Sequence, residues 1–187
     1  MTADEIVAAI APAVPGATYV ALASFDAAVT PTIGVPREQI VQTCRALQGP
    51  GLEFVAFSDV TAVDYHPNRL PRFDLVYHLV SPHRRARVRL KVGINAQEAV
   101  ETLSTLYPGA GWPEREVYDL FGIVFDGHPD LRRLMMPEDW EGHPLRKDYP
   151  VQLRKDAQTY MPLQVTEEEF KANMERDRFQ RGSAKPK

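Results

Sequence analysis

Two histidines and three carboxylates stand close together in the second half of the sequence and could carry hydrolytic chemistry. They are Asp126, His128, Asp130, Glu141 and His143. Imidazole nitrogens and carboxylate oxygens bind divalent metal ions, and a bound metal ion can activate a water molecule. Both histidines lie in Gly-His-Pro turns, so they lack the fixed i,i+3 or i,i+4 spacing of metal ligands on a helix. We therefore expect no metal site, and expect each histidine to hydrogen-bond a turn or a neighbouring chain.

Cofactor chemistry finds no motif in this chain. Neither the phosphate loop G-x-x-x-x-G-K-[ST] nor G-x-G-x-x-G after a strand is present, and no serine nucleophile elbow is recognisable. Cys44 is the only cysteine, so the chain cannot build a disulfide, a cysteine zinc site or an iron–sulfur site by itself. We expect Cys44 to be a core thiol. The sequence predicts no flavin, iron, zinc or NADH site within this chain.

The composition is that of a soluble globular protein, with 44% hydrophobic and 25% charged residues. No apolar run approaches the roughly 18–20 residues of a membrane span, and no secretory signal is apparent. We therefore expect any membrane association to come through a partner. The net charge of −3 argues against a nucleic-acid binder, which needs a basic field. The basic pairs Arg132-Arg133 and Arg146-Lys147 stand among acids and are better suited to pairing with a protein.

The segment 112–150 organises the chain because it mixes charge, aromatic residues and turn residues densely. Such a mixture is typical of an interface, where aromatic side chains and arginines provide much of the binding energy. The segment begins as a helix, with Pro113 near its start, an Arg115–Asp119 pair on one side, and Gly122 as its stop. Beyond residue 126 its prolines predict an extended, turning path over a surface.

The remaining elements predict an α+β fold with a small mixed or antiparallel sheet and helices on one face. Residues 1–125 form this core domain, and residues 126–187 form an extended, proline-rich C-terminal arm with a short terminal helix. Helices are expected at 3–11, 36–47, 95–106 and 166–178. Strands are expected at 18–25, 29–35, 52–65, 73–81 and 85–93, with the strand at 29–35 on a sheet edge because it contains Pro31. The strands from 52 to 93 should form an antiparallel meander.

The run E-R-E-V-Y-D-L-F-G-I-x-F-x-G-H-P-D-L-R-R-L, followed by M-P-E-D-W-x-G-H-P-L-R-K-D-Y-P, closely resembles the thirty-kilodalton subunit family of bacterial NADH:quinone oxidoreductase. This family is a core subunit of respiratory complex I. The resemblance spans nearly all of residues 114–150 and extends more weakly over the chain from residue 30. It implies a structural subunit of the peripheral arm that helps to hold the quinone-reducing module together. Its partner there would be the forty-nine-kilodalton-type subunit, which we call the large neighbouring subunit.

The resemblance also implies where cofactors and contacts lie. FMN, iron–sulfur clusters and quinone are expected on other subunits, and the chain is expected at the cytoplasmic side of the inner membrane as a peripheral protein. No catalytic, cofactor or metal residue is expected in this chain. Residues expected to contact a partner are Trp112, Glu114, Arg115, Glu116, Asp119, His128, Arg132, Arg133, Trp140, His143, Arg146, Lys147, Asp148 and Tyr149. Of these, the charges at 146–148 should matter only if they are desolvated against a partner or against this domain.

Two alternatives stay open at this point. One is the equivalent small subunit of a related membrane-bound hydrogenase or dehydrogenase, which shares the E-R-E…D and G-H-P…R-K-D-Y pattern. The other is a free-standing metal-dependent hydrolase that uses His128 and His143.

Overall fold

The structure of the chain is a computed structural model, and it describes residues 2–19, 30–150 and 171. Residues Met1–Pro150 form one compact unit, and Val151–Lys187 form a second one. Residues 126–150 thus belong to the same unit as the sheet. The helix expected at 166–178 lies outside the described residues except for residue 171, and so does most of the strand expected at 18–25.

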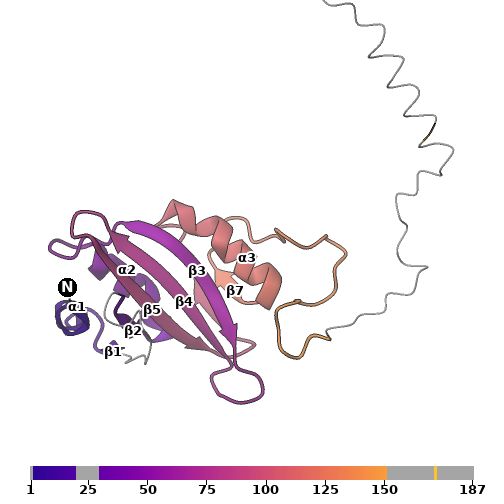
Figure 1. Ribbon diagram of the computed structural model, residues 1–187, viewed down its shortest axis with the longest axis horizontal. Helices are drawn as coiled ribbons and strands as arrows, with labels where there is room; N and C mark the ends of the chain where they lie inside the picture. The colour runs from indigo at the N-terminus through magenta and orange to yellow at the C-terminus, as the bar shows by residue number, and fades with distance from the viewer. Residues whose placement is uncertain (1, 20–29, 151–170, 172–187) are drawn as a thin grey trace, which may run out of the picture. The chain divides into compact units, whose positions relative to one another are not determined.

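A five-stranded mixed sheet forms the centre of the first unit, in the order β1-β2-β5-β4-β3. Strands β3, β4 and β5 are long neighbours joined as an antiparallel meander (Figure 1). Strand β2 runs parallel to β5, and β1 runs antiparallel to β2. The strands are β1 (Thr18–Tyr19), β2 (Thr32–Gly34), β3 (Ala56–Asp64), β4 (Phe73–Ser81) and β5 (Ala86–Ile94). The expected α+β class with a mixed sheet is confirmed.

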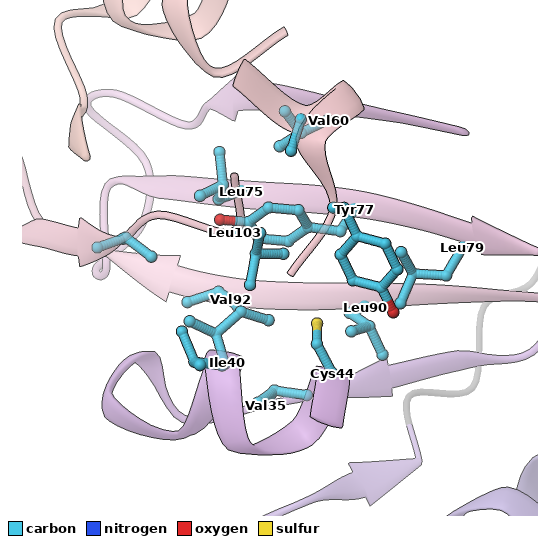
Figure 2. Packing of buried hydrophobic residues seen from close by; sticks show 14 of the residues in the cluster. Val35, Ile40, Cys44, Val60, Leu75, Tyr77, Leu79, Leu90, Val92 and Leu103 are labelled. Atoms are coloured by element: carbon cyan, nitrogen blue, oxygen red, sulfur yellow. The ribbon is translucent and has the colours of Figure 1, made fainter. Parts of the chain in front are cut away.

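Three α-helices contribute to a single hydrophobic core with the inner face of this sheet. They are α1 (Ala3–Ile10), α2 (Ile40–Gln48) and α3 (Gly111–Phe121), with short 3₁₀ turns at η1 (Arg37–Gln39) and η2 (Pro108–Ala110) before the last two. Helix α2 is amphipathic, and its apolar stripe points toward the strands (Figure 2). Cys44 is fully buried on that stripe, beside Tyr77 and Leu90, which confirms the expected core thiol.

The two faces of β5 differ sharply in polarity. Val88, Leu90 and Val92 are fully buried on the inner face, whereas Arg87, Arg89 and Lys91 stand between them on the outer face. This strict alternation follows from the period of two residues in a β-strand. The meander therefore offers an apolar surface to the helices and a largely polar surface on its other side.

The expected helix at 95–106 is wrong. Its capping signal is real in part, because Glu98 accepts a hydrogen bond from the backbone N–H of Asn95 at 2.7 Å. The following residues nevertheless form strand β6 (Ala99–Glu101), which pairs in parallel with β7 (Val124–Asp126). A long-range strand pairing has overridden a local helix preference.

The strand that follows Pro31 does not lie at an edge of the described sheet, because β2 has β1 on one side and β5 on the other. Pro31 stands just before β2 and uses its carbonyl oxygen to accept a hydrogen bond from Arg89. The missing N–H of the proline is therefore not needed in the sheet.

Candidate partner-binding segment

Residues 126–150, which we call the strap, follow β7 without any regular helix or strand of their own. This confirms the expected extended and turning path. Most strap residues are partly or fully exposed, yet the strap is fastened to α3 and to the β3–β4 hairpin by hydrogen bonds that span 14 to 83 residues. The geometry of these attachments decides which side chains remain available to a partner.

The strap satisfies the carbonyl groups at the C-terminal end of α3. Gly122 ends the helix in the left-handed conformation, at φ 73°, as the sequence predicts. The last carbonyls of a helix have no partner within it and need one elsewhere. The acceptors and donors pair as follows: Asp119 O with His143 Nδ1 at 2.9 Å, Leu120 O with Leu145 N at 3.0 Å, Phe121 O with Arg146 Nε, and Gly122 O with Arg146 Nη2 at 3.3 Å.

Gly122 is needed for a second reason besides its positive φ. A Cβ atom built at this position would collide with the side chains of Arg146 and His143. A side chain here would therefore displace two of the groups that satisfy the helix end. The close approach of the strap to α3 depends on this glycine.

The side chain of Asp119 is the most heavily bonded group that faces the strap. One carboxylate oxygen accepts the backbone N–H groups of Leu134, Met135 and Met136 at 3.0, 2.7 and 2.8 Å, and the other accepts Arg133 Nη1 at 2.7 Å. The side chain is 0% exposed. Burial opposes its ionisation, but the hydrogen bonds from Met136 and Arg133 prevail and lower the pKa of Asp119 below its ordinary value.

The expected i,i+4 pair of Arg115 with Asp119 is wrong. Arg115 instead donates to the carbonyl oxygens of Arg132 and Arg133, both at 3.1 Å, and approaches Asp130 at 3.5 Å. Asp119 points to the other end of the same strap segment, where it meets Arg133. Helix spacing allows the local pair, but backbone groups of the strap compete for both side chains.

A second attachment joins the strap to the β3–β4 hairpin. Arg72 binds Asp64 with two hydrogen bonds of 2.7 and 3.0 Å and binds Asp148 with two of 2.7 and 2.9 Å. The backbone N–H of Lys147 donates to Asp64 at 2.8 Å. Burial opposes ionisation of Asp64, yet the bonds from Arg72 and Lys147 hold its pKa far below its usual range. Bidentate arginine–carboxylate pairs of this kind fix orientation as well as position.

Glu114 and His128 lie together in the interior. Glu114 is 0% exposed and accepts hydrogen bonds from the hydroxyl group of Thr102 and from Leu103 N at 2.7 Å. Burial raises the pKa of Glu114. His128 accepts Asp130 N at its Nδ1 and donates from Nε2 to Gly111 O, both at 3.0 Å, which fixes the neutral tautomer with its proton on Nε2.

These contacts separate the residues that could have formed a metal site. Both nitrogens of His128 are used within its turn and at the start of α3, and Nδ1 of His143 is used at the end of α3. Within the described residues, no group of three or more His, Cys, Asp or Glu side chains is placed to hold a metal ion. Both histidines hydrogen-bond the chain itself, which is one of the two arrangements expected for them.

Aromatic rings complete the strap. Trp140 stacks on Tyr149 with ring centroids 6.4 Å apart, and the Tyr149 hydroxyl group donates to Glu141 O at 3.3 Å. Trp112, at the start of α3, is 64% exposed and lies under the Arg115 guanidinium group, 5.3 Å from its ring centroid. An exposed tryptophan beside an arginine is a common composition of binding surfaces.

The expected partner-binding residues thus fall into two groups, and their contact with a partner stays a prediction for both. One group has its side chains engaged within the chain: Glu114, Arg115, Asp119, His128, Arg133, His143, Arg146 and Asp148, with the Trp140–Tyr149 ring pair. The other group is exposed: Trp112, Glu116, Arg132 and Lys147. Sequence reasoning missed Asp64 and Arg72, although a hairpin that crowds charges between prolines at 64–74 was a usable signal.

The amino-acid sequence of residues 33–155 matches the family described as the respiratory-chain NADH dehydrogenase, 30 Kd subunit. This match covers the three long strands, α3 and the whole strap. The chain belongs to this family.

Relatives named as the same kind of NADH-quinone oxidoreductase subunit match much of the chain. The protein is 50% identical to that subunit of Geobacter sulfurreducens over 65% of this chain and 75% of that one. It is 43% identical to that subunit of Methylobacterium radiotolerans over 88% of this chain and 81% of that one.

Two solved structures share the fold. A trypsin-resistant fragment of Nqo5 is 32% identical, with a TM-score of 0.58, over 70% of this chain and the whole of the fragment. A chain of the membrane-bound sulfane sulfur reductase, an archaeal respiratory membrane complex, is 25% identical, with a TM-score of 0.66, over 87% of this chain and 94% of that one. Among the described residues of the present chain, no helix has the length and apolar character to cross a membrane.

Proposed function

We propose that this chain is a structural subunit of the peripheral arm of a proton-translocating NADH:quinone oxidoreductase, and that it helps to assemble the quinone-reducing module with the large neighbouring subunit. The observation that carries the proposal is the family match over residues 33–155, which includes the strap. Relatives that are named as a NADH-quinone oxidoreductase subunit support the same assignment.

The chain would carry no redox group and no catalytic residue. The chemistry of its residues supports this role, because Cys44 is buried and burial raises the pKa of its thiol far above the usual range. A thiol in that setting is a poor metal ligand and a poor nucleophile. Both strap histidines and the Asp119 carboxylate are bonded within the chain. FMN, iron–sulfur clusters and quinone would then be held by other subunits.

The strap gives this role a physical basis. Its attachments fix the backbone of residues 130–149 in place, while Trp112 of α3 and Arg132 and Lys147 of the strap have exposed side chains. A surface whose shape is fixed in advance loses less conformational entropy on binding than a disordered one. The large neighbouring subunit would bind this surface, and the complex would hold the chain at the cytoplasmic side of the inner membrane.

Co-purification tests the proposal. The chain is tagged in its own organism, membranes are solubilised in mild detergent, and the bound chains are identified by mass spectrometry. We expect the large neighbouring subunit among them and NADH:quinone reductase activity in the eluate, whereas the isolated chain should contain neither flavin nor iron. Recovery of the chain without respiratory subunits would refute the proposal, and stoichiometric metal in the isolated chain would refute its cofactor-free role.

A second candidate has one specific observation in its favour. The match to a chain of the membrane-bound sulfane sulfur reductase extends over 87% of this chain, so the fold also serves in a different respiratory membrane complex. The chain could then be the equivalent subunit of a related membrane-bound hydrogenase or dehydrogenase. The same purified complex separates the two candidates, because only the first one oxidises NADH.

A further inference from the structure

The outer face of the sheet contains a small cationic cavity that is separate from the strap. Its volume is about 200 Å³, and it is lined by Thr30, Ser58, His78, Leu79, Val80, Arg87 and Arg89. In the register of the sheet, His78 lies directly opposite Arg89, and Val80 lies directly opposite Arg87. Side chains that face each other in this way, or diagonally, stand within reach of one another.

The positive charge of this cavity is not neutralised by the described part of the chain. On the same face of β5, Lys91 forms an ion pair with Asp74 at 3.0 Å. Arg87 and Arg89 have no such carboxylate partner among the described residues, although they stand two positions apart on one face. Two neighbouring guanidinium groups repel each other, and an anion between them would remove that cost.

The environment of His78 shows the same excess of positive charge. Burial comes first, and the nearby Arg89 and Arg87 add to it, so that the pKa of His78 is lowered, against the opposing effect of Asp59. These three charged groups are the neighbours that act on the imidazole. An anion bound between the arginines would favour the protonated imidazole and raise the pKa of His78.

The size and the donors of the cavity indicate which anion fits. A volume of about 200 Å³ is below that of the pockets that enclose drug-sized ligands, roughly 300–1,000 Å³. The donors are side chains on strands whose backbone N–H groups are used in the sheet, and no helix N-terminus or glycine loop contributes to the described lining. Phosphate sites commonly rely on such backbone donors, whereas a carboxylate matches the fork of an arginine directly.

We propose that this cavity receives the carboxylate of an aspartate or glutamate side chain from a neighbouring subunit. The inference rests on the proposed function for the existence of that neighbour, and the cavity itself does not depend on it. The outer face of the sheet would then be a second interface, opposite in charge to its partner and independent of the strap.

The first experiment measures anion binding to the full chain. N-acetyl-glutamate α-amide, which carries one side-chain carboxylate, is titrated into the purified protein, and the imidazole of His78 is followed by NMR. We expect saturable binding that raises the pKa of His78. The variant R87Q/R89Q should bind the probe about tenfold more weakly or not at all.

Controls for this titration separate the carboxylate from other sources. R45Q removes an exposed arginine from α2, in the helical layer, and should bind the probe as the wild type does. N-acetyl-glutamine amide should not bind. Equal binding by R87Q/R89Q and the wild type overturns the cavity as an anion site, and clearly tighter binding of inorganic phosphate than of the carboxylate probe overturns the side-chain carboxylate as its ligand.

The second experiment measures assembly. The tagged wild-type, R87Q/R89Q and R45Q chains are expressed in the native organism, and the amount of complex that co-purifies is compared at equal levels of the chain. We expect a several-fold loss in R87Q/R89Q alone, with the melting temperature of the isolated chain unchanged. Full assembly of this variant overturns the second interface. Absence of respiratory subunits with the wild-type chain instead overturns the proposed function, while the titration still decides the cavity.

Discussion

The guanidinium group of Arg146 donates to the carbonyl oxygen of Phe121, the last residue of α3. The same group reaches Gly122 O and stands 5.8 Å from the centre of the Phe73 ring. It therefore joins the strap, the end of a helix and the first residue of β4. Burial is the main influence on this group and lowers the pKa of Arg146, but the group remains charged at any ordinary pH.

Replacement of Arg146 by alanine should destabilise the unit itself. The change leaves two carbonyl groups at the end of α3 without a donor, at an expected cost of about 1–3 kcal/mol. Arg146→Lys should recover only part of this loss, because an ammonium group cannot reproduce two directed hydrogen bonds. Urea unfolding of the full chain measures the difference. Lys147→Ala, at an exposed neighbour, is the control, and equal stability of both alanine variants would refute the role of Arg146.

Asp119 should be even more sensitive. Its removal strands the Arg133 charge and leaves three backbone N–H groups unsatisfied, so Asp119→Ala should cost about 3–5 kcal/mol. Asp119→Asn should also destabilise, because its amide offers one acceptor where the carboxylate offers two. Thermal unfolding is the measurement, with Glu116→Gln on the exposed side of α3 as control. A melting temperature of the alanine variant near that of the wild type would contradict the structure of the strap.

Glu114 should make the chain less stable as the pH rises. Its pKa is raised by burial, so the folded state binds more protons than the unfolded state between the ordinary pKa of a glutamate and the folded one. Glu114→Gln keeps an acceptor for Leu103 N and removes this titration. We expect the glutamine variant to gain in stability relative to the wild type as the pH increases above about 4.3. A difference between the two proteins that is independent of pH would contradict this prediction.

His143 should have the opposite effect on the pH dependence. Burial, and then Arg146 and Arg133, lower its pKa, while its bond to Asp119 O acts against them. The folded state therefore binds fewer protons than the unfolded state, and stability should fall as the pH drops below about 6.5. Unfolding curves from pH 8 to pH 5, a range chosen to bracket that value, measure this slope. His143→Gln should reduce the slope, whereas His83→Gln, at an exposed turn, should leave it unchanged.

Trp112 should contribute to assembly rather than to folding. Its side chain is 64% exposed and lies against Arg115 in a cation–π arrangement. If the large neighbouring subunit covers it, Trp112→Ala should reduce binding by about 2 kcal/mol or more, as buried tryptophans at interfaces do. The amount of complex recovered from membranes is the readout. Leu70→Ala, at another exposed apolar residue, is the control, and normal assembly of the Trp112 variant would remove this residue from the interface.

Strong local signals predicted much of the fold. Strand β4 has the predicted bounds, and Gly122 ends α3 because no L side chain takes a positive φ there without strain. Helix α2 follows its apolar stripe. The helix predicted at 95–106 failed because the pairing of β6 with β7 connects residues 25 positions apart, which a capping signal cannot reveal.

The site was predictable as a segment but not as a set of contacts. The density of charge and aromatic residues at 112–150 identified the strap. The partners of Asp119 could not be read from spacing, because three of them are backbone N–H groups in a stretch without periodicity. Arg72 and Asp148 are 76 positions apart, and only the folded chain brings them together. The expectation that the Arg146 region would be desolvated holds for Arg146 within this unit.

The strap also sets a condition on the synthesis of the protein. Asp64 and Asp119 are buried carboxylates whose counter-charges or hydrogen-bond donors are partly supplied by residues 133–148, which leave the ribosome later. A nascent or truncated chain that ends before Arg133 would have these acids without that support and an unsatisfied end of α3. Such a product should remain partly open and accessible to cellular proteases, since degradation follows the population of open forms. Completion of the strap thus serves as a check that translation has reached the end of the unit.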